Sequence, residues 1–128
     1  MYAVELDRSK RLLVISAVQR VAAREVKAVA QRVREVLRDV APGFHVLADF
    51  RWLESMDSTA AQPLAEIMDA LAEKEVASVT RVISDPHKDI GLNILSPFHY
   101  GPNVSILTFE TLADAIQSIA AKTDSKSA

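Results

Sequence analysis

The residues most capable of chemistry lie in one short segment, 49–61. Asp49 ends an apolar run, and Asp57, Ser58 and Thr59 come just before a stretch with helical periodicity. Backbone N–H groups at a helix N-terminus favour negative charge, and a phosphate on a hydroxyl there adds about −1.5 to −2 of charge. The carboxylates of Asp49 and Asp57 would repel that phosphate. The segment therefore predicts a surface switched between two charge states; helix capping by Asp57, Ser58 or Thr59 is the alternative.

Other kinds of site are missing from the sequence. The three Gly residues lie too far apart to form a phosphate-binding loop, and the three His residues lack metal-ligand spacing. Residues 85–89, DPHKD, contain potential metal ligands, but a turn followed by the start of a helix explains them. The absence of Cys excludes disulfides and a thiol nucleophile. We expect no catalytic residue, no metal and no cofactor, and therefore a protein that is not an enzyme.

Composition and charge are those of an ordinary globular domain. Of the 128 residues, 49% are hydrophobic and 25% charged, and a net charge of −2 gives no reason to expect nucleic-acid binding. The longest apolar run, Leu12–Val18, is too short to span a bilayer, so we expect a cytoplasmic protein. Residues 1–40 carry nine Lys or Arg and five Asp or Glu, whereas residues 41–80 carry two and seven. This uneven charge predicts either two solvated faces of opposite sign or a docking surface.

Hydrophobic periodicity divides the chain into short elements. The expected elements are a strand at 2–6, a turn at 7–10, a strand at 11–16, a helix at 22–40, a strand at 44–50, a loop at 51–58, a helix ending near 74, a strand at 76–83, a helix at 90–98, a strand at 103–109 and a helix from 112. Strands that alternate with helices predict a parallel sheet. The fold class is therefore α/β, ββαβαβαβα, with a mainly parallel five-stranded sheet and an antiparallel first strand. One domain is expected over 1–122, followed by a disordered polar tail at 123–128.

The 49–61 segment resembles the signature of the STAS domain, the family named for sulphate transporters and anti-sigma factor antagonists. That signature is a strand ending in Asp, a turn with apolar positions, and Asp-Ser-Ser/Thr-Gly opening a helix. The matching positions here are Asp49, Leu53, Met56, Asp57, Ser58 and Thr59. Residues 104–116, VSILTFETLADAI, resemble the last strand and helix of the family. The resemblance covers about residues 1–120 and implies a STAS-like fold.

The resemblance also implies a function. In bacterial anti-sigma factor antagonists the second hydroxyl of the motif, here Thr59, is phosphorylated by a partner kinase that is itself the anti-sigma factor. The unphosphorylated form binds that kinase. Asp49, Trp52, Met56 and Asp57 would then contact the protein partner, with Ser58 as the other phosphorylation candidate.

Two residues depart from the family pattern. Ala60 replaces the Gly of the motif and would hinder close approach of a partner. Pro63 disfavours a helix that begins at Ser58 or Thr59 and itself suits the first position of a helix. We therefore expect the helix to begin at Pro63, and a start at Ser58 or Thr59 is the alternative.

A second hypothesis is a carrier or sensor of an apolar ligand. Related Sec14-type domains imply a ligand held between the sheet and the helices, and Trp52, Phe98 and Tyr100 are the candidate lining here, together with Met56. Packing of these rings against the sheet is the alternative. Self-association is a further expectation, because an edge strand or the apolar second helix could pair in a homodimer.

Overall fold

The computed structural model describes residues 1–83, Tyr100 and residues 103–127. The elements are β1 (Tyr2–Asp7), β2 (Leu12–Val21), α1 (Ala23–Val36), a 3-10 turn (Leu37–Asp39), β3 (His45–Met56), a 3-10 turn (Ser58–Ala60), α2 (Ala61–Glu73), β4 (Ser78–Val82), β5 (Ser105–Phe109) and α4 (Leu112–Ser127). The helix expected at 90–98 lies outside the described residues.

The strands form one five-stranded sheet in the order β1-β2-β3-β4-β5. Strand β1 is antiparallel to β2, and the other neighbours are parallel. This confirms the predicted α/β fold class, with its mainly parallel sheet and antiparallel first strand. The hairpin between β1 and β2 follows from the polar turn between them, and the parallel pairs need the helical crossovers that the alternating pattern predicts.

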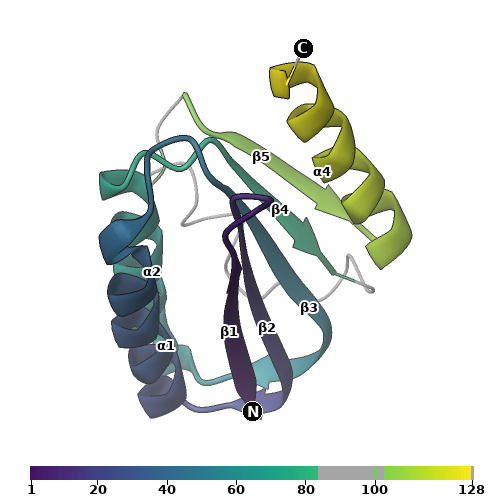
Figure 1. The fold of residues 1–128 in the computed structure, drawn as a ribbon. Helices are drawn as coiled ribbons and strands as arrows, with labels where there is room; N and C mark the ends of the chain where they lie inside the picture. Colours follow the sequence, from purple (N-terminus) through teal and green to yellow (C-terminus); the bar gives the residue numbers. More distant parts are fainter. Residues whose placement is uncertain (84–99, 101–102, 128) are drawn as a thin grey trace.

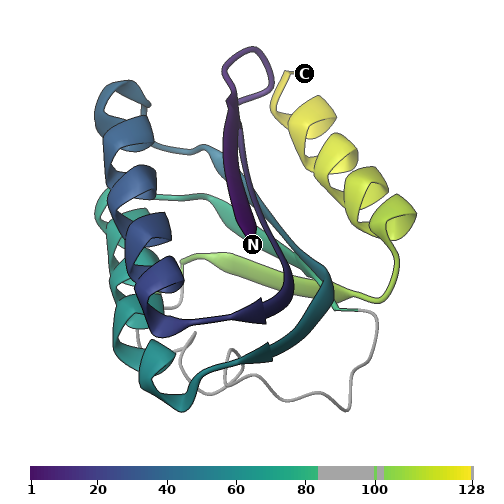
Figure 2. The same cartoon turned by 90° about the horizontal axis from the view of Figure 1, so that it is seen from below.

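Helices cover both faces of the sheet (Figures 1 and 2). Helices α1 and α2 lie side by side on one face, and α4 lies on the other. The larger core lies beneath α1 and α2. It is built from strand residues two apart, which share a face of the sheet, and from helix residues three or four apart, which share a side of the helix. Its members include Leu13, Ile15, Val29, Val33 and Leu71. A smaller core beneath α4 is formed by Leu47, Val82, Ala115 and Ile119.

Two strands extend further than the sequence predicts. Strand β2 continues to Val21 and β3 to Met56, so the loop expected at 51–58 is wrong for residues 51–56. The two strands remain paired over this extension through register shifts. Within 51–56 only Leu53 is buried, between the exposed Trp52 and Glu54, and one buried position does not distinguish a half-exposed strand from a loop.

The C-terminal helix also exceeds its expected length. Helix α4 runs to Ser127, whereas the sequence predicts a disordered tail from residue 123. A polar segment is compatible with a helix, because every hydrogen bond of a helix lies within the segment itself.

Candidate functional site

The outer half of β3 carries the first part of the predicted site. The Asp49 carboxylate accepts two hydrogen bonds from the Arg51 guanidinium, from Nε to Oδ1 at 2.9 Å and from Nη2 to Oδ2 at 2.9 Å. The Arg51 backbone N–H also donates to Oδ1, at 3.2 Å. Partial burial disfavours the charged carboxylate, but the hydrogen bonds from Arg51 outweigh it and lower the pKa of Asp49. The charge of Asp49 is therefore compensated by Arg51, which weakens the repulsion that the sequence suggested.

Trp52 lies on the exposed part of the same strand. Its side chain is 64% exposed, whereas the neighbouring Leu53 is buried in the core beneath α1 and α2. Because successive strand residues point to opposite faces, Trp52 lies on the α4 side of the sheet. The Arg51 guanidinium lies 5.5 Å from the centroid of the Trp52 ring, within cation–π distance. Asp49, Arg51 and Trp52 thus form a connected, partly exposed strip.

The other aromatic candidates do not join this strip. Tyr100 packs against the core beneath α1 and α2, and burial raises the pKa of its phenol despite the nearby Arg81 charge. Tyr100 and Trp52 therefore lie on opposite sides of the sheet. Phe98, the third residue of the expected ligand pocket, lies outside the described residues. Met56 ends β3 with its side chain packed against the larger core.

The connection from β3 to α2 holds the motif Asp57-Ser58-Thr59. The Asp57 N–H donates to the Val21 carbonyl at 3.2 Å, which ties the connection to the end of β2. Asp57 precedes the 3-10 turn, and its side chain makes no capping hydrogen bond. Helix α2 begins at Ala61, with Ala60 as its N-cap. The expected start at Pro63 is therefore wrong. The chain becomes helical at Ser58, in the 3-10 turn that leads directly into α2, and Asp57 stands at the N-cap position of that turn without a side-chain hydrogen bond.

Both departures from the family motif are accommodated. Pro63 is the third residue of α2, where its missing N–H removes no helical bond, because the first four N–H groups of a helix have no acceptor within it. Ala60 is fully buried. Its methyl group faces the core, so it does not obstruct the surface as the sequence suggested.

Thr59 lines a groove between the first turns of α1 and α2. The residue is exposed and lines a groove of about 250 Å³ together with Ala23, Arg24, Lys27, Gln62, Pro63 and Glu66. The two cations come from α1. The carboxylate of Glu66 lies 4.0 Å from the Arg34 guanidinium, a partner outside the groove. The groove therefore combines an exposed hydroxyl with two positive charges and one anion that has a cation of its own.

Sequence reasoning did not connect Arg24 and Lys27 with Thr59. The excess of Lys and Arg over the first 40 residues was the available signal, but it gave no register between the two helices. That register comes from the packing of α1 against α2 and the 3-10 turn.

The described part of the chain holds neither a metal-binding cluster nor a membrane-spanning helix. Within residues 1–83, Tyr100 and 103–127, no group of three His, Asp or Glu is placed to hold a metal ion. The segment 85–89 lies outside these ranges. None of the helices described is long and apolar enough to cross a membrane.

Comparisons with known proteins identify the fold. No protein-family model and no curated protein sequence matches the chain. An uncharacterised DUF3478-family protein from Shewanella loihica PV-4, which has a SpoIIAA-like fold, superposes with a TM-score of 0.71 at 18% identity, covering 92% of this chain and 93% of that one. The anti-sigma factor antagonist SpoIIAA in its unphosphorylated form gives a TM-score of 0.59 at 15% identity, covering 94% and 98%. The chain therefore has a SpoIIAA-like, STAS-like fold.

Proposed function

We propose that the chain is a non-enzymatic regulatory module that binds a protein partner and is switched by phosphorylation of Thr59. One observation carries the choice of residue: Thr59 is exposed in the groove that holds Arg24 and Lys27. Ser58, which precedes it in the same turn, is the alternative phosphate acceptor. The SpoIIAA-like fold supports an anti-sigma factor kinase as the partner, and hence a bacterial, cytoplasmic setting.

Electrostatics favour a phosphate at this position. A phosphothreonine carries about −1.5 to −2 charges and three strong acceptor oxygens, and placed opposite basic side chains it gains charge-assisted hydrogen bonds. Arg24 and Lys27 supply these donors. The N-terminus of α2 adds a favourable dipole, while Pro63 withholds one of its N–H groups. The two cations thus take over part of the role that free N–H groups play at other helix ends.

The partner surface continues along the outer half of β3. Trp and Arg dominate the binding energy of many interfaces, and Trp52 is held by Arg51, which is itself held by Asp49. Asp57 connects this strip to the phosphorylated turn. Met56, with its side chain against the core, positions the connection from within. A phosphate on Thr59 would change the charge at one end of this surface and weaken partner binding.

The modification is tested with ATP, the purified chain and an anti-sigma factor kinase from the same cell. Tandem mass spectrometry is expected to find phosphate on Thr59, which Thr59→Ala abolishes and Ser58→Ala preserves. Phosphate on Ser58 alone would move the site to its neighbour. A kinase that binds the chain but transfers no phosphate to either residue would overturn the switch.

Partner binding is tested separately by titration calorimetry. Trp52→Ala is expected to weaken the complex at least about ten-fold. The matched control is Leu107→Ala, which truncates another exposed side chain, 38% accessible, on the distant strand β5. Equal effects of the two variants would remove the strip from the interface.

The role of the groove is tested with phosphothreonine incorporated at residue 59 during synthesis, which needs no kinase. The phosphate pKa, followed by ³¹P NMR, is expected to rise in Arg24→Gln/Lys27→Gln, because two cations that favour the dianion are lost. Arg38→Gln, in the 3-10 turn that follows α1, is the control. An unchanged phosphate pKa in the double variant would exclude the groove as the phosphate site.

A further inference from the structure

Among the described strands, β1 is the edge of the sheet and pairs only with β2, so one row of its backbone groups has no strand partner there. Met1 and Val18 exchange hydrogen bonds, with the Val18 N–H donating to the Met1 carbonyl at 2.9 Å. In an antiparallel pair such residues alternate, so Ala3, Glu5 and Asp7 direct their backbone groups toward β2. The N–H and C=O groups of Tyr2, Val4 and Leu6 therefore point to the open edge.

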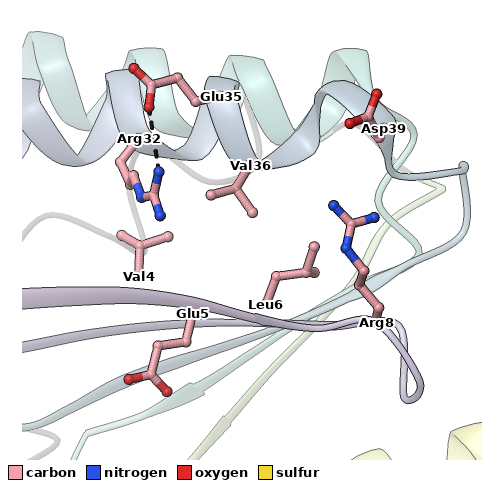
Figure 3. Close-up of a pocket in the computed structure, with 8 residues that line it drawn as sticks. All are labelled: Val4, Glu5, Leu6, Arg8, Arg32, Glu35, Val36 and Asp39. Atoms are coloured by element: carbon pink, nitrogen blue, oxygen red, sulfur yellow. Dashed lines mark hydrogen bonds and ion pairs between the residues drawn. The ribbon is translucent and has the colours of Figure 1, made fainter.

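A groove runs along this edge between β1 and α1 (Figure 3). Its volume is about 510 Å³, and its lining residues are Val4, Glu5, Leu6, Arg8, Arg32, Glu35, Val36 and Asp39. Val4 and Leu6 point toward α1 and are half-buried, while Glu5 points to the opposite face. The edge thus combines outward-pointing backbone groups with the apolar side chains of Val4 and Leu6, which α1 covers only in part.

We infer that the open edge of β1 pairs with β1 of a second copy of this chain, antiparallel, about a two-fold axis through Val4. In this register Val4 faces Val4 of the other copy, and Tyr2 faces its Leu6. These are the residues whose backbone groups point outward, so on the order of six backbone hydrogen bonds form. The two sheets would then join into one.

Side-chain charge selects the Val4 axis over its neighbours. An axis through Glu5 would set two Glu5 carboxylates directly opposite each other, and an axis through Leu6 would set Glu5 opposite Asp7. Like charges in such cross-strand positions are unfavourable. An axis through Ala3 would leave Leu6 without a partner. The Val4 axis places Ala3 opposite Glu5, with no charge facing a like charge, and it sets Tyr2, Val4 and Leu6 of one copy opposite Leu6, Val4 and Tyr2 of the other.

The rim of the groove is compatible with a second copy. Arg32 and Glu35 form an exposed ion pair at 3.5 Å on α1, beside Val4 (Figure 3). A two-fold axis near Val4 brings the Arg32–Glu35 pairs of both copies together. Each copy then offers one cation and one anion, so the pairs can exchange partners across the interface. This charge complementarity favours a second copy over a peptide of unrelated charge.

The proposal is tested by sedimentation of the full chain at increasing concentration. The wild-type chain is expected to dimerise, and Ala3→Glu is expected to weaken the dimer at least about ten-fold because it sets two carboxylates opposite each other. Ala3→Lys should tighten it, and Ala3→Glu/Glu5→Lys should restore it. Positions 3 and 5 are exposed, so the monomer should keep its circular dichroism and Tm. A chain that stays monomeric at millimolar concentration, or equal effects of Ala3→Glu and Ala3→Lys, would overturn the proposal.

The register is read by cross-linking, since the chain has no Cys. A mixture of Ala3→Cys and Glu5→Cys chains should form a disulfide between copies, and each variant alone should not. Efficient cross-linking of Glu5→Cys alone would overturn the Val4 axis. Leu107→Lys on β5, the opposite edge, is the control. A dimer that Leu107→Lys dissociates and Ala3→Glu leaves intact would assign the contact to β5 instead.

Discussion

The two faces of the sheet are built differently. Beneath α1 and α2 the apolar core is large, with Leu13 and Val33 fully buried, and a buried charged residue, Arg81 of β4, lies on this face near Tyr100. Beneath α4 the apolar core is small, and polar residues are buried beside it: the His45 Nδ1 lies 2.7 Å from the Ser78 hydroxyl, and Thr80 is fully buried. One face thus contributes most of the hydrophobic stabilisation. Among the described helices only α4 lies on the other face, and the Asp49–Arg51–Trp52 strip lies on that face, with Trp52 64% exposed.

The contrast is tested most strongly by two adjacent leucines of β2. Leu13→Ala should lower the free energy of unfolding by about 3 kcal/mol, because it opens a cavity in the larger core. Leu12→Ala, on the half-buried α4 side, should cost about 1 kcal/mol. Urea denaturation of both variants measures the difference. Equal losses would show that the two faces contribute alike.

The buried polar pair beneath α4 gives the next largest effect. Ser78→Ala removes the 2.7 Å hydrogen bond to His45 and should destabilise the fold by about 1–2 kcal/mol. The matched control is Ser105→Ala, where an exposed hydroxyl bonds the Lys122 Nζ at 3.1 Å. We expect less than about 0.5 kcal/mol there. A Ser78→Ala variant as stable as Ser105→Ala would show that the buried bond contributes nothing.

Thr80 offers a change in the opposite direction. Within the described part of the chain, its buried hydroxyl has no hydrogen-bond partner. Thr80→Val should therefore raise the free energy of unfolding, by about 1 kcal/mol, since it removes a buried polar group while keeping the shape. The midpoint of urea unfolding should move up at constant slope. A lower midpoint would mean that the hydroxyl is needed.

The smallest expected effect is the loss of folding stability in acid when Asp49, in the exposed strip, is protonated. Because the pKa of Asp49 is lowered in the folded state, its stabilisation is complete above the unfolded pKa of about 3.9 and is lost as the pH falls through the folded value. The loss should be about 0.5 kcal/mol. Arg51→Gln should abolish this acid-dependent loss, and Arg38→Gln should leave it unchanged. Parallel stability curves for wild type and Arg51→Gln between pH 7 and pH 2 would contradict the assignment.

The fold was largely predictable because its signals are periodic. The α1 residues Val26, Val29 and Val33 recur at helical spacing, and Pro42 follows the helix. The end of β3 was not predictable, because β3 is held there by pairing with β2 across two register shifts. The start of α2 was missed for a related reason: a 3-10 turn precedes it, and Pro63 fits within its first turn.

For the candidate site, the sequence located the motif but not its surroundings. Asp57, Ser58 and Thr59 were identified from local spacing. Arg24 and Lys27 lie more than 30 positions away, and their place beside Thr59 depends on how α1 packs against α2. The pairing of Asp49 with Arg51 was also missed, because the sequence placed Arg51 in a loop, whereas β3 continues through it to Met56.

The sequence by itself determined the order of elements, the antiparallel first strand and the position of the hydroxyl motif, because periodicity and turn residues act over a few neighbouring positions. Only the tertiary structure decided which face each helix covers, which cations surround Thr59 and which backbone groups of β1 are left open. Those features depend on contacts between distant segments. Such contacts form where buried area and hydrogen bonding are best satisfied over the whole chain.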